Sequence, residues 1–288
     1  MAEKPLDTDA AWELVLNAVN RRNVTLPLPE SQQDAVRVNG HGSWHLLHPA
    51  TEAARNLLSV FMPLCRPLEQ DSQPRVIGQL GQSLDGRIAT VTGCSRFING
   101  DDGITHLHRI RAVSDAVVVG TGTAVTDNPR LTVRRSSGPN PVRVVIDRHR
   151  RVPDSHHLFT DGEAPTLRLV AGRYQPQTLS LAPGTVVEVP CLGETVENVP
   201  ADPAVILKVL NNLGLRKVFI EGGGVTVSSF LKAGLLDRLH VMVAPMIIGS
   251  GRPAFSLPEI DLLDDALRPR AQLINLGSDM LFDLDFSQ

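Results

Sequence analysis

Cysteine is scarce in this chain of 288 residues, which contains only Cys65, Cys94 and Cys191. Three scattered cysteines supply neither a disulfide framework nor the paired ligands of a structural zinc site. The net charge is only −3, so there is no electrostatic reason to expect nucleic acid or an anionic membrane as a partner. The composition therefore argues against a disulfide-stabilised domain, a zinc-binding module and a nucleic-acid-binding protein.

Long apolar runs are missing as well. No run approaches the roughly 20 residues that a membrane-spanning helix needs. The first residues, MAEKPLDTDA, lack the basic-then-apolar pattern of a secretory signal. There is no internal repeat and no low-complexity tract. A hydrophobic content of 42% suffices for one large core, or for one domain with an appendage. We expect a cytoplasmic protein without a membrane segment.

The first 73 residues differ in character from the rest. Apolar residues have helical spacing over 12–19 and 53–61, and a polar, proline-rich stretch containing LPLPESQQD separates the two segments. The run EQDSQP near residue 70 is typical of a linker. His41, His45 and His48 lie near one another in sequence, but no cysteine or carboxylate completes a metal-ligand set. We therefore predict an N-terminal extension, residues 1–73, of unknown role, a separate domain over 74–288, and no metal site.

From residue 75 onward, short β-rich runs alternate with helical patterns. This alternation predicts a mostly parallel sheet covered by helices on both faces. Two final β-rich runs, 271–276 and 280–286, are separated by a Gly-Ser-Asp turn and predict an antiparallel hairpin. The expected strands are 76–80, 116–120, 142–147, 166–170, 186–189, 217–220 and 238–244, and the expected helices are 102–113, 203–213 and 225–234.

The strongest single motif lies in residues 216–235, RKVFIEGGGVTVSSFLKAGL. An apolar strand runs into Glu221 and three glycines, and a segment with helical spacing follows at once. Glycines at such a junction let a bulky anion approach the backbone, and the helix start supplies free N–H groups. A glycine turn that merely reverses the chain is the alternative. The acidic residue before the glycines, where a sheet opens towards ligand, favours a binding site.

Two further stretches follow expected strands. The first, GQSLDGRIAT at 81–90, contains a tight Asp-Gly turn, and its small residues leave room for a flat ring. The second, GTGTAVTDNPRLTVR at 120–134, superficially resembles a dinucleotide fingerprint, but Val125 stands at the third glycine position and Asp127-Asn128-Pro129 interrupts any helix. We therefore reject a Rossmann fold and predict a polar loop carrying Thr123, Asp127 and Arg134. A surface turn and a surface ion pair are the respective alternatives.

Two basic groups complete the candidates. Arg109 and Arg111 lie near the end of an expected helix, where they either offset its dipole or hold a phosphate. Arg148, Arg150 and Arg151 follow an expected strand and either face a cofactor 2′-phosphate or form a solvated turn. Spacing alone does not decide between these roles.

Several separated blocks, in order, resemble a known family. They are SLDGRIAT, SRFINGDDG, HRIRAVSDAVVVGTGTAVTDNPRLTVR, RVVIDRHRRVP, VFIEGGG and APMIIGSGRP. Together they resemble the reductase domain of the bifunctional riboflavin-biosynthesis deaminase–reductase, which is related to dihydrofolate reductase. The resemblance covers about residue 75 to the C-terminus. It implies a dihydrofolate reductase-like fold, a mostly parallel sheet flanked by helices, with the hairpin at its end.

The resemblance also implies ligands and roles. Family members use NADPH to reduce 5-amino-6-(5-phosphoribosylamino)uracil to its ribitylamino form. Asp127 and Glu221 are the implied catalytic residues: Asp127 would orient the cofactor or assist proton transfer, and Glu221 would bind polar groups of the substrate. The family usually has Trp where this chain has Phe97. The implied cofactor-binding residues are Gly81, Phe97, Thr123, Asp127, Arg148, Gly222, Gly223, Gly224, Val225 and Thr226, and the implied substrate-binding residues are Ser95, Arg111, Leu131, Arg134 and Glu221.

The chain also departs from the bifunctional proteins. Their deaminase half carries H-x-E and P-C-x-x-C motifs, which a zinc-activated hydroxide requires. Here no H-x-E occurs and Pro190-Cys191 lacks the second cysteine, so we predict a stand-alone reductase without deaminase activity.

Three functions follow, in order of preference. The first is an NADPH-dependent pyrimidine reductase, the second a pterin or dihydrofolate-type reductase, and the third a non-catalytic nucleotide-binding protein. Arg111 and Arg134 favour the first, because a pterin reductase would not need both for a phosphate. Family members commonly dimerise through their sheets, and the apolar strands at 271–286 predict a homodimer interface.

Overall fold

The computed structural model describes residues 4–39, 43–70, 72–96, 98–193 and 201–287. The chain divides into two compact units, Met1–Ser72 and Gln73–Gln288, which we describe separately. Among the described residues, no helix combines the length and the apolarity that a bilayer crossing needs.

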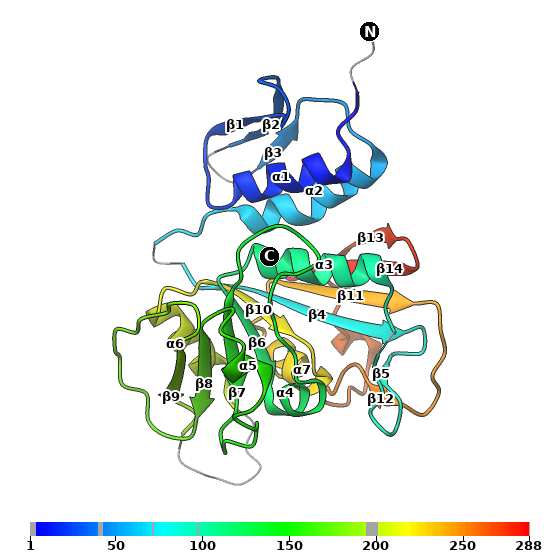
Figure 1. Ribbon diagram of the computed structural model, residues 1–288. Coiled ribbons are helices and arrows are strands. Elements are labelled where there is room, and N and C mark those ends of the chain that lie inside the picture. The colour runs from blue at the N-terminus through cyan, green and yellow to red at the C-terminus, as the bar shows by residue number, and fades with distance from the viewer. Residues whose placement is uncertain (1–3, 40–42, 71, 97, 194–200, 288) are drawn as a thin grey trace. The chain divides into compact units, whose positions relative to one another are not determined.

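The N-terminal unit consists of two helices and a small antiparallel sheet (Figure 1). Each helix begins at a residue whose side chain caps it: Asp7 accepts a hydrogen bond from the Ala10 N–H, and Thr51 accepts one from the Ala54 N–H. The helices are α1 (Thr8–Ala18) and α2 (Glu52–Cys65), and the strands, in spatial order, are β1 (Val24–Pro27), β2 (Asp34–Val38) and β3 (Trp44–Leu46).

The two helices share one apolar core. The Trp12 ring meets Phe61 edge-on, with 5.2 Å between centroids, and the Cys65 thiol donates to the Val15 carbonyl at 3.4 Å. The polar, proline-rich stretch between the helices was not predicted to contain strands, yet it forms the sheet. Within the described residues, no group of three or more His, Cys, Asp or Glu side chains could hold a metal ion. His41, one of the clustered histidines, lies outside those residues.

The second unit is built on a sheet of nine strands, counted over the described residues (Figure 1). The strands from β11 to β9 are parallel to their neighbours, and the hairpin β13–β14 joins antiparallel to β11. In spatial order the strands are β13 (Arg270–Leu276), β14 (Asp279–Asp285), β11 (Arg238–Ala244), β4 (Arg75–Ser83), β10 (Lys217–Glu221), β6 (Ala116–Gly120), β7 (Val142–Ile146), β8 (Thr166–Val170) and β9 (Val186–Pro190). This arrangement confirms the fold class predicted from the sequence.

Helices cover both faces of this sheet. Alternate strand residues such as Val76, Val118 and Val218 pack in one core with residues of α6 (Pro203–Asn212) and α7 (Gly224–Lys232). The residues between them face the other side, where α3 (Asp101–Ala112) packs. On that side Nε2 of His106, in α3, lies 3.0 Å from Nδ1 of His240, in β11. The short elements are α4 (Thr121–Asp127), α5 (His157–Thr160), the 3₁₀ turn η1 (Leu263–Asp265) and the strand pair β5 (Arg87–Ala89) and β12 (Arg252–Pro253).

Helix α4 corrects one expectation. Residues 120–134 were predicted to be a polar loop, because Asp-Asn-Pro interrupts a helix. The interruption occurs there: Asn128 takes a left-handed conformation, with φ of 42°, and closes α4. Before it, however, Thr121–Asp127 forms a two-turn helix that follows β6 directly. Asp127 is thus the last residue of a helix.

Candidate active site

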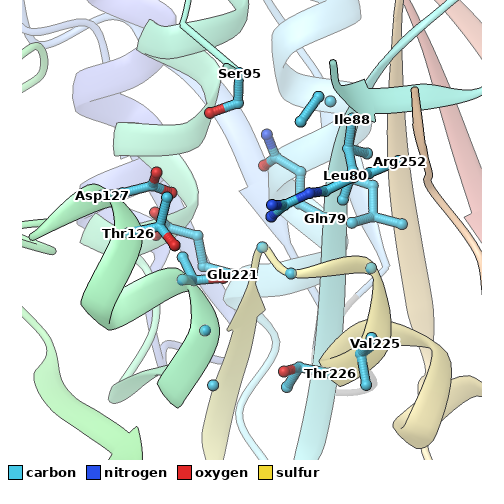
Figure 2. A pocket seen from close by; sticks show the side chains of 18 of the residues that line it. Gln79, Leu80, Ile88, Ser95, Thr126, Asp127, Glu221, Val225, Thr226 and Arg252 are labelled. Carbon is cyan, nitrogen blue, oxygen red and sulfur yellow. The ribbon is translucent and has the colours of Figure 1, made fainter. Parts of the chain in front are cut away.

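A cavity of about 1040 Å³ opens where several parallel strands end (Figure 2). Its walls include Gly81 of β4, Gly120 at the end of β6, Ile146 at the end of β7 and Glu221 at the end of β10. Carboxyl ends of neighbouring parallel strands meet at one edge of a sheet, and ligands of open α/β sheets bind outside that edge. All of the residues lining this cavity belong to the second unit.

The glycine loop forms one wall of this cavity. Gly222 and Gly223 have φ values of 70° and 69°, which side-chain-bearing residues rarely adopt. A Cβ on Gly223 would also lie 2.8 Å from Thr123 Oγ1, and one on Gly224 would collide with the Ala254 carbonyl. Helix α7 begins at Gly224 and has no side-chain cap, so its first N–H groups are available to an anion.

Beside this loop, Glu221 is held by an arginine from the opposite helix. Arg111 of α3 donates through Nε to Glu221 Oε2 at 2.7 Å and through Nη2 to Oε1, and its Nη1 donates to the Thr132 carbonyl at 2.8 Å. Arg111 is 4% exposed. A buried fork of this kind fixes the carboxylate in one orientation. Arg111 thus holds Glu221 at the cavity wall and does not itself line the cavity.

Asp127 and Arg252 enter the cavity from opposite sides (Figure 2). Partial burial raises the pKa of Asp127, although the positive charges of Arg96 and Arg252 act against that rise. Within the described part of the chain, the Arg252 side chain makes no hydrogen bond and no ion pair shorter than 4.0 Å. Both charged groups are therefore open to a ligand.

Hydrogen bonds to the backbone before Arg252 fix the position of this residue. Asp85, from the predicted Asp-Gly turn, accepts hydrogen bonds from the N–H groups of Ile248 and Gly249 at 3.1 and 2.6 Å. The hydroxyl of Ser83 also donates to Asp85, and these bonds lower the pKa of its carboxyl to about 2. Three residues after Gly249, Arg252 pairs with Ala89 in the short strand pair β5–β12. The Asp-Gly turn therefore has a structural role beyond reversing the chain.

The backbone of the basic loop after β7 is held by a buried carboxylate, Asp147. The buried Asp147 carboxylate accepts hydrogen bonds from the N–H groups of Arg151 and Val152 at 2.9 and 3.0 Å. Arg148 and Arg151 line the cavity. Arg150, in contrast, forms a two-pronged pair with Glu188 at 2.8 and 2.9 Å and lies outside the lining. The loop thus presents fixed cations at this end of the cavity.

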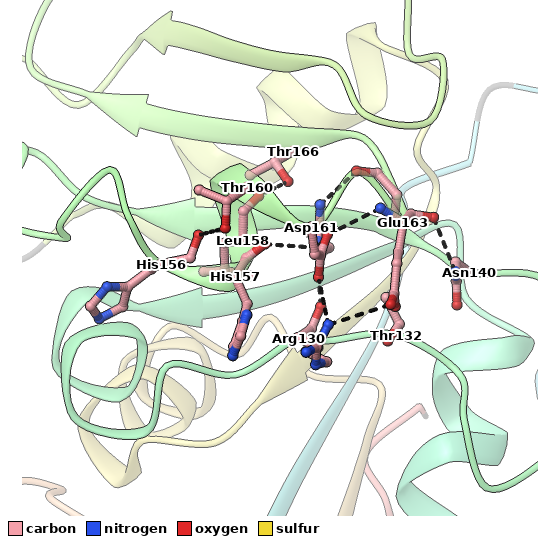
Figure 3. Close-up of polar contacts among 12 residues, drawn as sticks. Arg130, Thr132, Asn140, His156, His157, Leu158, Thr160, Asp161, Glu163 and Thr166 are labelled. Atoms are coloured by element: carbon pink, nitrogen blue, oxygen red, sulfur yellow. Dashed lines mark hydrogen bonds and ion pairs between the residues drawn. The ribbon is translucent and has the colours of Figure 1, made fainter.

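Hydrogen bonds and ion pairs hold the segment after α4 at several points (Figure 3). Arg130 Nη1 lies 3.4 Å from Glu163 Oε1, and Asn140 donates to the Glu163 carbonyl at 3.2 Å. Between them, Leu131 is buried with a φ of 54°, a strained conformation for leucine. Arg134 donates to Thr132 Oγ1 at 2.7 Å. Thr132 therefore contacts both arginines that were predicted to bind the substrate.

A buried histidine holds the backbone of Arg134 in place. The Arg134 backbone N–H donates to Nδ1 of His108, in α3, at 2.9 Å. Burial lowers the pKa of His108 to about 3, and the charges of Arg111, Arg134 and Arg135 act in the same direction. His108 is therefore neutral at physiological pH, which leaves Nδ1 free to accept.

Comparison with known proteins identifies the family. Residues 74–277 match the family described as the RibD C-terminal domain. The chain belongs to this family. It is 36% identical, over 220 residues, to a protein of Methanothermobacter thermautotrophicus named 2,5-diamino-6-ribosylamino-4(3H)-pyrimidinone 5′-phosphate reductase, covering 73% of this chain and 97% of that protein. It is 33% identical, over 211 residues, to riboflavin biosynthesis protein RibD of Aquifex aeolicus, covering 73% of this chain but 57% of that protein.

Solved structures agree with this assignment. RibD of Acinetobacter baumannii is similar over 81% of this chain and 63% of its own, with a TM-score of 0.60 and 26% identity. A deaminase/5-amino-6-(5-phosphoribosylamino)uracil reductase from Thermotoga maritima is similar over 81% of this chain and 61% of its own, with a TM-score of 0.58 and 26% identity. The family membership predicted from the sequence blocks is confirmed.

The structure brings most of the predicted site residues of this RibD C-terminal domain to one place. Gly81, Ser95, Thr123, Asp127, Arg148, Glu221 and residues 222–226 line the cavity. Arg111, Leu131 and Arg134 stand behind Glu221 and outside the lining. Phe97 lies outside the described residues.

Sequence reasoning missed several residues that line the cavity, among them Gln79, Asn99 and Arg252. Arg252 stood within the family block APMIIGSGRP, but nothing in that block showed that its side chain faces the site. Gln79 carried a signal that could have been used, because it lies between the apolar and small residues of 76–81, and a polar residue in such a run is rare unless it has a partner.

Proposed function

We propose that the second unit is a nicotinamide-dependent reductase that converts the ribosyl group of a 6-(ribosylamino)pyrimidinone 5′-phosphate to a ribityl chain. The observation that carries this proposal is the glycine loop, which opens into the same cavity as Asp127 and Glu221. The name of the Methanothermobacter relative, which this chain covers over 97% of its length, supports the substrate class. We assign no chemistry to residues 1–72.

The loop and the basic segment fit NADPH. The unobstructed backbone at 222–224 and the uncapped start of α7 suit a pyrophosphate, because the free N–H groups and the positive helix end attract anions. Arg148 and Arg151 supply positive charge at the end of β7, where a 2′-phosphate would distinguish NADPH from NADH. When bound, the nicotinamide supplies a hydride.

The substrate would occupy the side of the cavity that Ser95 and Glu221 line. Glu221 is fixed by Arg111 and offers its carboxylate to N–H or O–H groups of the pyrimidinone or the sugar. Arg134 is exposed beyond Thr132 and is the natural partner of the 5′-phosphate.

The reaction reduces C1′ of the open-chain imine, so one C–H bond forms and the imine nitrogen gains a proton. The chain's main task is to hold the two ligands at the correct distance and angle. Asp127 stands at the cavity wall with a raised pKa, so it is suited to hold a proton and deliver it to the imine nitrogen.

Loss of the nicotinamide absorbance tests the proposal. It is measured with 2,5-diamino-6-ribosylamino-4(3H)-pyrimidinone 5′-phosphate, with 5-amino-6-(5-phosphoribosylamino)uracil and, separately, with dihydrofolate. The two pyrimidinones differ in carrying a 2-amino or a 2-oxo group. Turnover of a pyrimidinone that falls at least tenfold in Arg134→Ala supports it. Arg135→Ala is the matched control, because Arg135 pairs instead with the exposed Asp101. Turnover of dihydrofolate alone would assign the protein to the pterin reductases, and binding of NADPH without any turnover would indicate a non-catalytic protein.

The choice of NADPH has its own test. Arg148→Ala should weaken NADPH about tenfold while leaving NADH unchanged, since only NADPH carries the 2′-phosphate. Arg150→Ala is the control, because Glu188 already engages Arg150. Equal effects of Arg148→Ala on both cofactors would place the 2′-phosphate elsewhere.

We further propose that the protein is a homodimer that associates through its C-terminal hairpin. Strand β13 is at the edge of the sheet, and Leu273 on it is 57% exposed. Met280 on β14 is 39% exposed. Open edges with apolar side chains favour pairing with another chain. Sedimentation that shows a monomer at micromolar concentration would refute this association.

A further inference from the structure

Two amide side chains in the cavity wall have unpaired polar atoms. Gln79 is 3% exposed, and its Oε1 has no hydrogen-bond partner in the described residues (Figure 2). Its Nε2 has only a weak acceptor, the Met242 sulfur at 3.5 Å. The Nδ2 of Asn99 is likewise buried and unpaired within the described part of the chain. Both side chains line the cavity.

These two amides lie against the same short piece of backbone. Gly81 follows Gln79 by two residues on β4, so both positions face the same side of the sheet. Asn99 Oδ1 occupies the place that a Cβ on Gly81 would take. Only glycine at position 81 therefore lets the Asn99 amide lie against β4, at a position two residues along the strand from Gln79.

A buried polar atom without a partner is destabilising, and the great majority of such atoms in folded proteins are paired. Two in one ligand-sized cavity therefore call for an explanation. The same free energy is recovered if a ligand supplies the missing partners. The pair is then a preformed recognition site, and its cost to the unliganded protein becomes affinity when the site is filled.

The chemistry of the pair defines what it recognises. An amide offers both a donor and an acceptor, whereas Lys or Arg only donates and an ionised carboxylate only accepts. Two amides against the same stretch of β4 match a planar group in which a C=O stands next to an N–H. Closely spaced donor and acceptor atoms of this kind occur at the lactam edge of a pyrimidinone and in the carboxamide of nicotinamide.

We infer that Gln79 and Asn99 form a binding pair for a lactam or carboxamide edge of the bound ligand. The inference rests on the proposed function for the identity of the ligand, and it adds specificity residues that hold the flat ring against β4. The pairing requires no charge on either partner, so it selects ligands by hydrogen-bond pattern.

Two variants and a matched control test the pair. Gln79→Met keeps nearly the same shape but removes both polar atoms, and Asn99→Ala removes the second amide. Gln82→Met is the control, because Gln82 lies on the same strand and also has an unpaired Oε1, but it is outside the cavity lining. Calorimetric titration with NADPH alone and with 2,5-diamino-6-ribosylamino-4(3H)-pyrimidinone 5′-phosphate alone gives separate dissociation constants.

We expect Gln79→Met and Asn99→Ala each to weaken one of the two ligands about tenfold, with Gln82→Met unchanged. Weaker binding of the pyrimidinone identifies its lactam edge as the recognised group, and weaker binding of NADPH identifies the carboxamide. The melting temperature of unliganded Gln79→Met should equal or exceed that of the wild type, because an orphaned polar group is removed.

Wild-type affinity for both ligands in Gln79→Met and Asn99→Ala would overturn the inference, as would a lower melting temperature of Gln79→Met without any change in binding. A wild-type protein that binds NADPH but reduces neither pyrimidinone would refute the proposed function instead. In that case the NADPH titrations still test the amide pair.

Discussion

The cavity carries two sets of charges that differ in how they are held. The locked charges, Arg111 and Glu221, are bound to each other through two hydrogen bonds and are largely shielded from solvent. The open charges, Asp127 and Arg252, face the cavity from opposite sides and form no ion pair with each other. One site therefore contains a carboxylate and a guanidinium that are paired with each other, and a second carboxylate and guanidinium that are not.

The difference separates architecture from binding. A buried pair costs desolvation when the chain folds and repays that cost only by its fixed geometry. It suits a carboxylate that must stay in place before any ligand arrives. Charges that face an open cavity keep part of their water until a ligand replaces it, so their attraction contributes mainly to binding rather than to folding. Each prediction below tests one side of this contrast.

The largest expected effect is on the locked side. Arg111→Met leaves Glu221 shielded without its partner, so the free energy of unfolding should fall by about 3–5 kcal/mol. Urea denaturation measures this loss. The double variant Arg111→Met with Glu221→Gln removes the uncompensated charge and should regain part of it. A loss below about 1 kcal/mol in the single variant would mean that the pair is not locked.

Next is the carboxylate of the open set. Asp127→Asn keeps the shape but cannot transfer a proton, so kcat should fall about 10²-fold. The urea midpoint should stay unchanged, since Asp127 has no partner to lose among the described residues. The dissociation constant of NADPH should also stay unchanged, because the proposed role of Asp127 is towards the imine of the substrate. Steady-state kinetics with NADPH titration distinguishes the outcomes. Weaker NADPH binding at unchanged kcat would make Asp127 a cofactor-binding group only.

Arg252→Ala removes the opposite charge, and we expect kcat/KM to fall about tenfold, which is one ligand-facing charge-assisted hydrogen bond. Stability should change by less than about 0.5 kcal/mol, because the side chain has no partner to lose in the part of the chain that the structure describes. Removing this cation also raises the pKa of Asp127 further, so the limb of the pH–rate profile that Asp127 governs should move to higher pH. Arg268→Ala, at an exposed site outside the cavity, is the control. A pH–rate profile identical to that of the wild type would mean that the charge of Arg252 does not influence the pKa of Asp127.

The smallest effect concerns His108, which supports the locked side. Its pKa is about 3 in the folded protein and near 6.5 in the unfolded chain, so between these values the unfolded state binds more protons. Its contribution to stability is therefore complete above pH 6.5 and is lost as the pH falls towards 3. His108→Asn keeps an acceptor for the Arg134 N–H and should flatten this dependence by about 1 kcal/mol or less between pH 6.5 and 5.5, after allowance for solvent screening. Urea unfolding at both pH values measures it, and an unchanged slope would contradict the assignment.

Sequence reasoning succeeded where one local signal dominates. The central strands β6, β7 and β10 are mostly apolar, as expected for a sheet buried on both faces, and they were predicted to within one residue. The glycine loop was equally clear, because three glycines between a strand and a helix have few other uses. By contrast, β1, β2 and β3 are three to five residues long and lie among prolines and polar residues, so their pattern was too short to read.

What could not be predicted depends on contacts between distant positions. The pair Arg111–Glu221 joins residues that are 110 positions apart, so the sequence alone could not show that Arg111 serves the carboxylate. Arg252 reaches the cavity only because Asp85, far earlier in the chain, holds the preceding turn. The absence of a Cβ at Gly81 is explained only by Asn99, whose side chain lies where that Cβ would be. In each case the chemistry was visible in the sequence, but the partner was not.

The order of strands also has a consequence for how the chain folds during synthesis. The earliest strand of the sheet, β4, lies inside it, and both of its neighbours, β10 and β11, are made only after β6 to β9, with residue 75 paired to residue 217 (Figure 1). The strands β6 to β9 can pair locally while the ribosome is still working, but β4 must wait exposed for the remaining chain. Closing so long a loop is slow. Strand β4, which supplies part of the cavity wall, therefore gains both of its neighbours late, and a nascent chain that stops before residue 217 has no active site to protect.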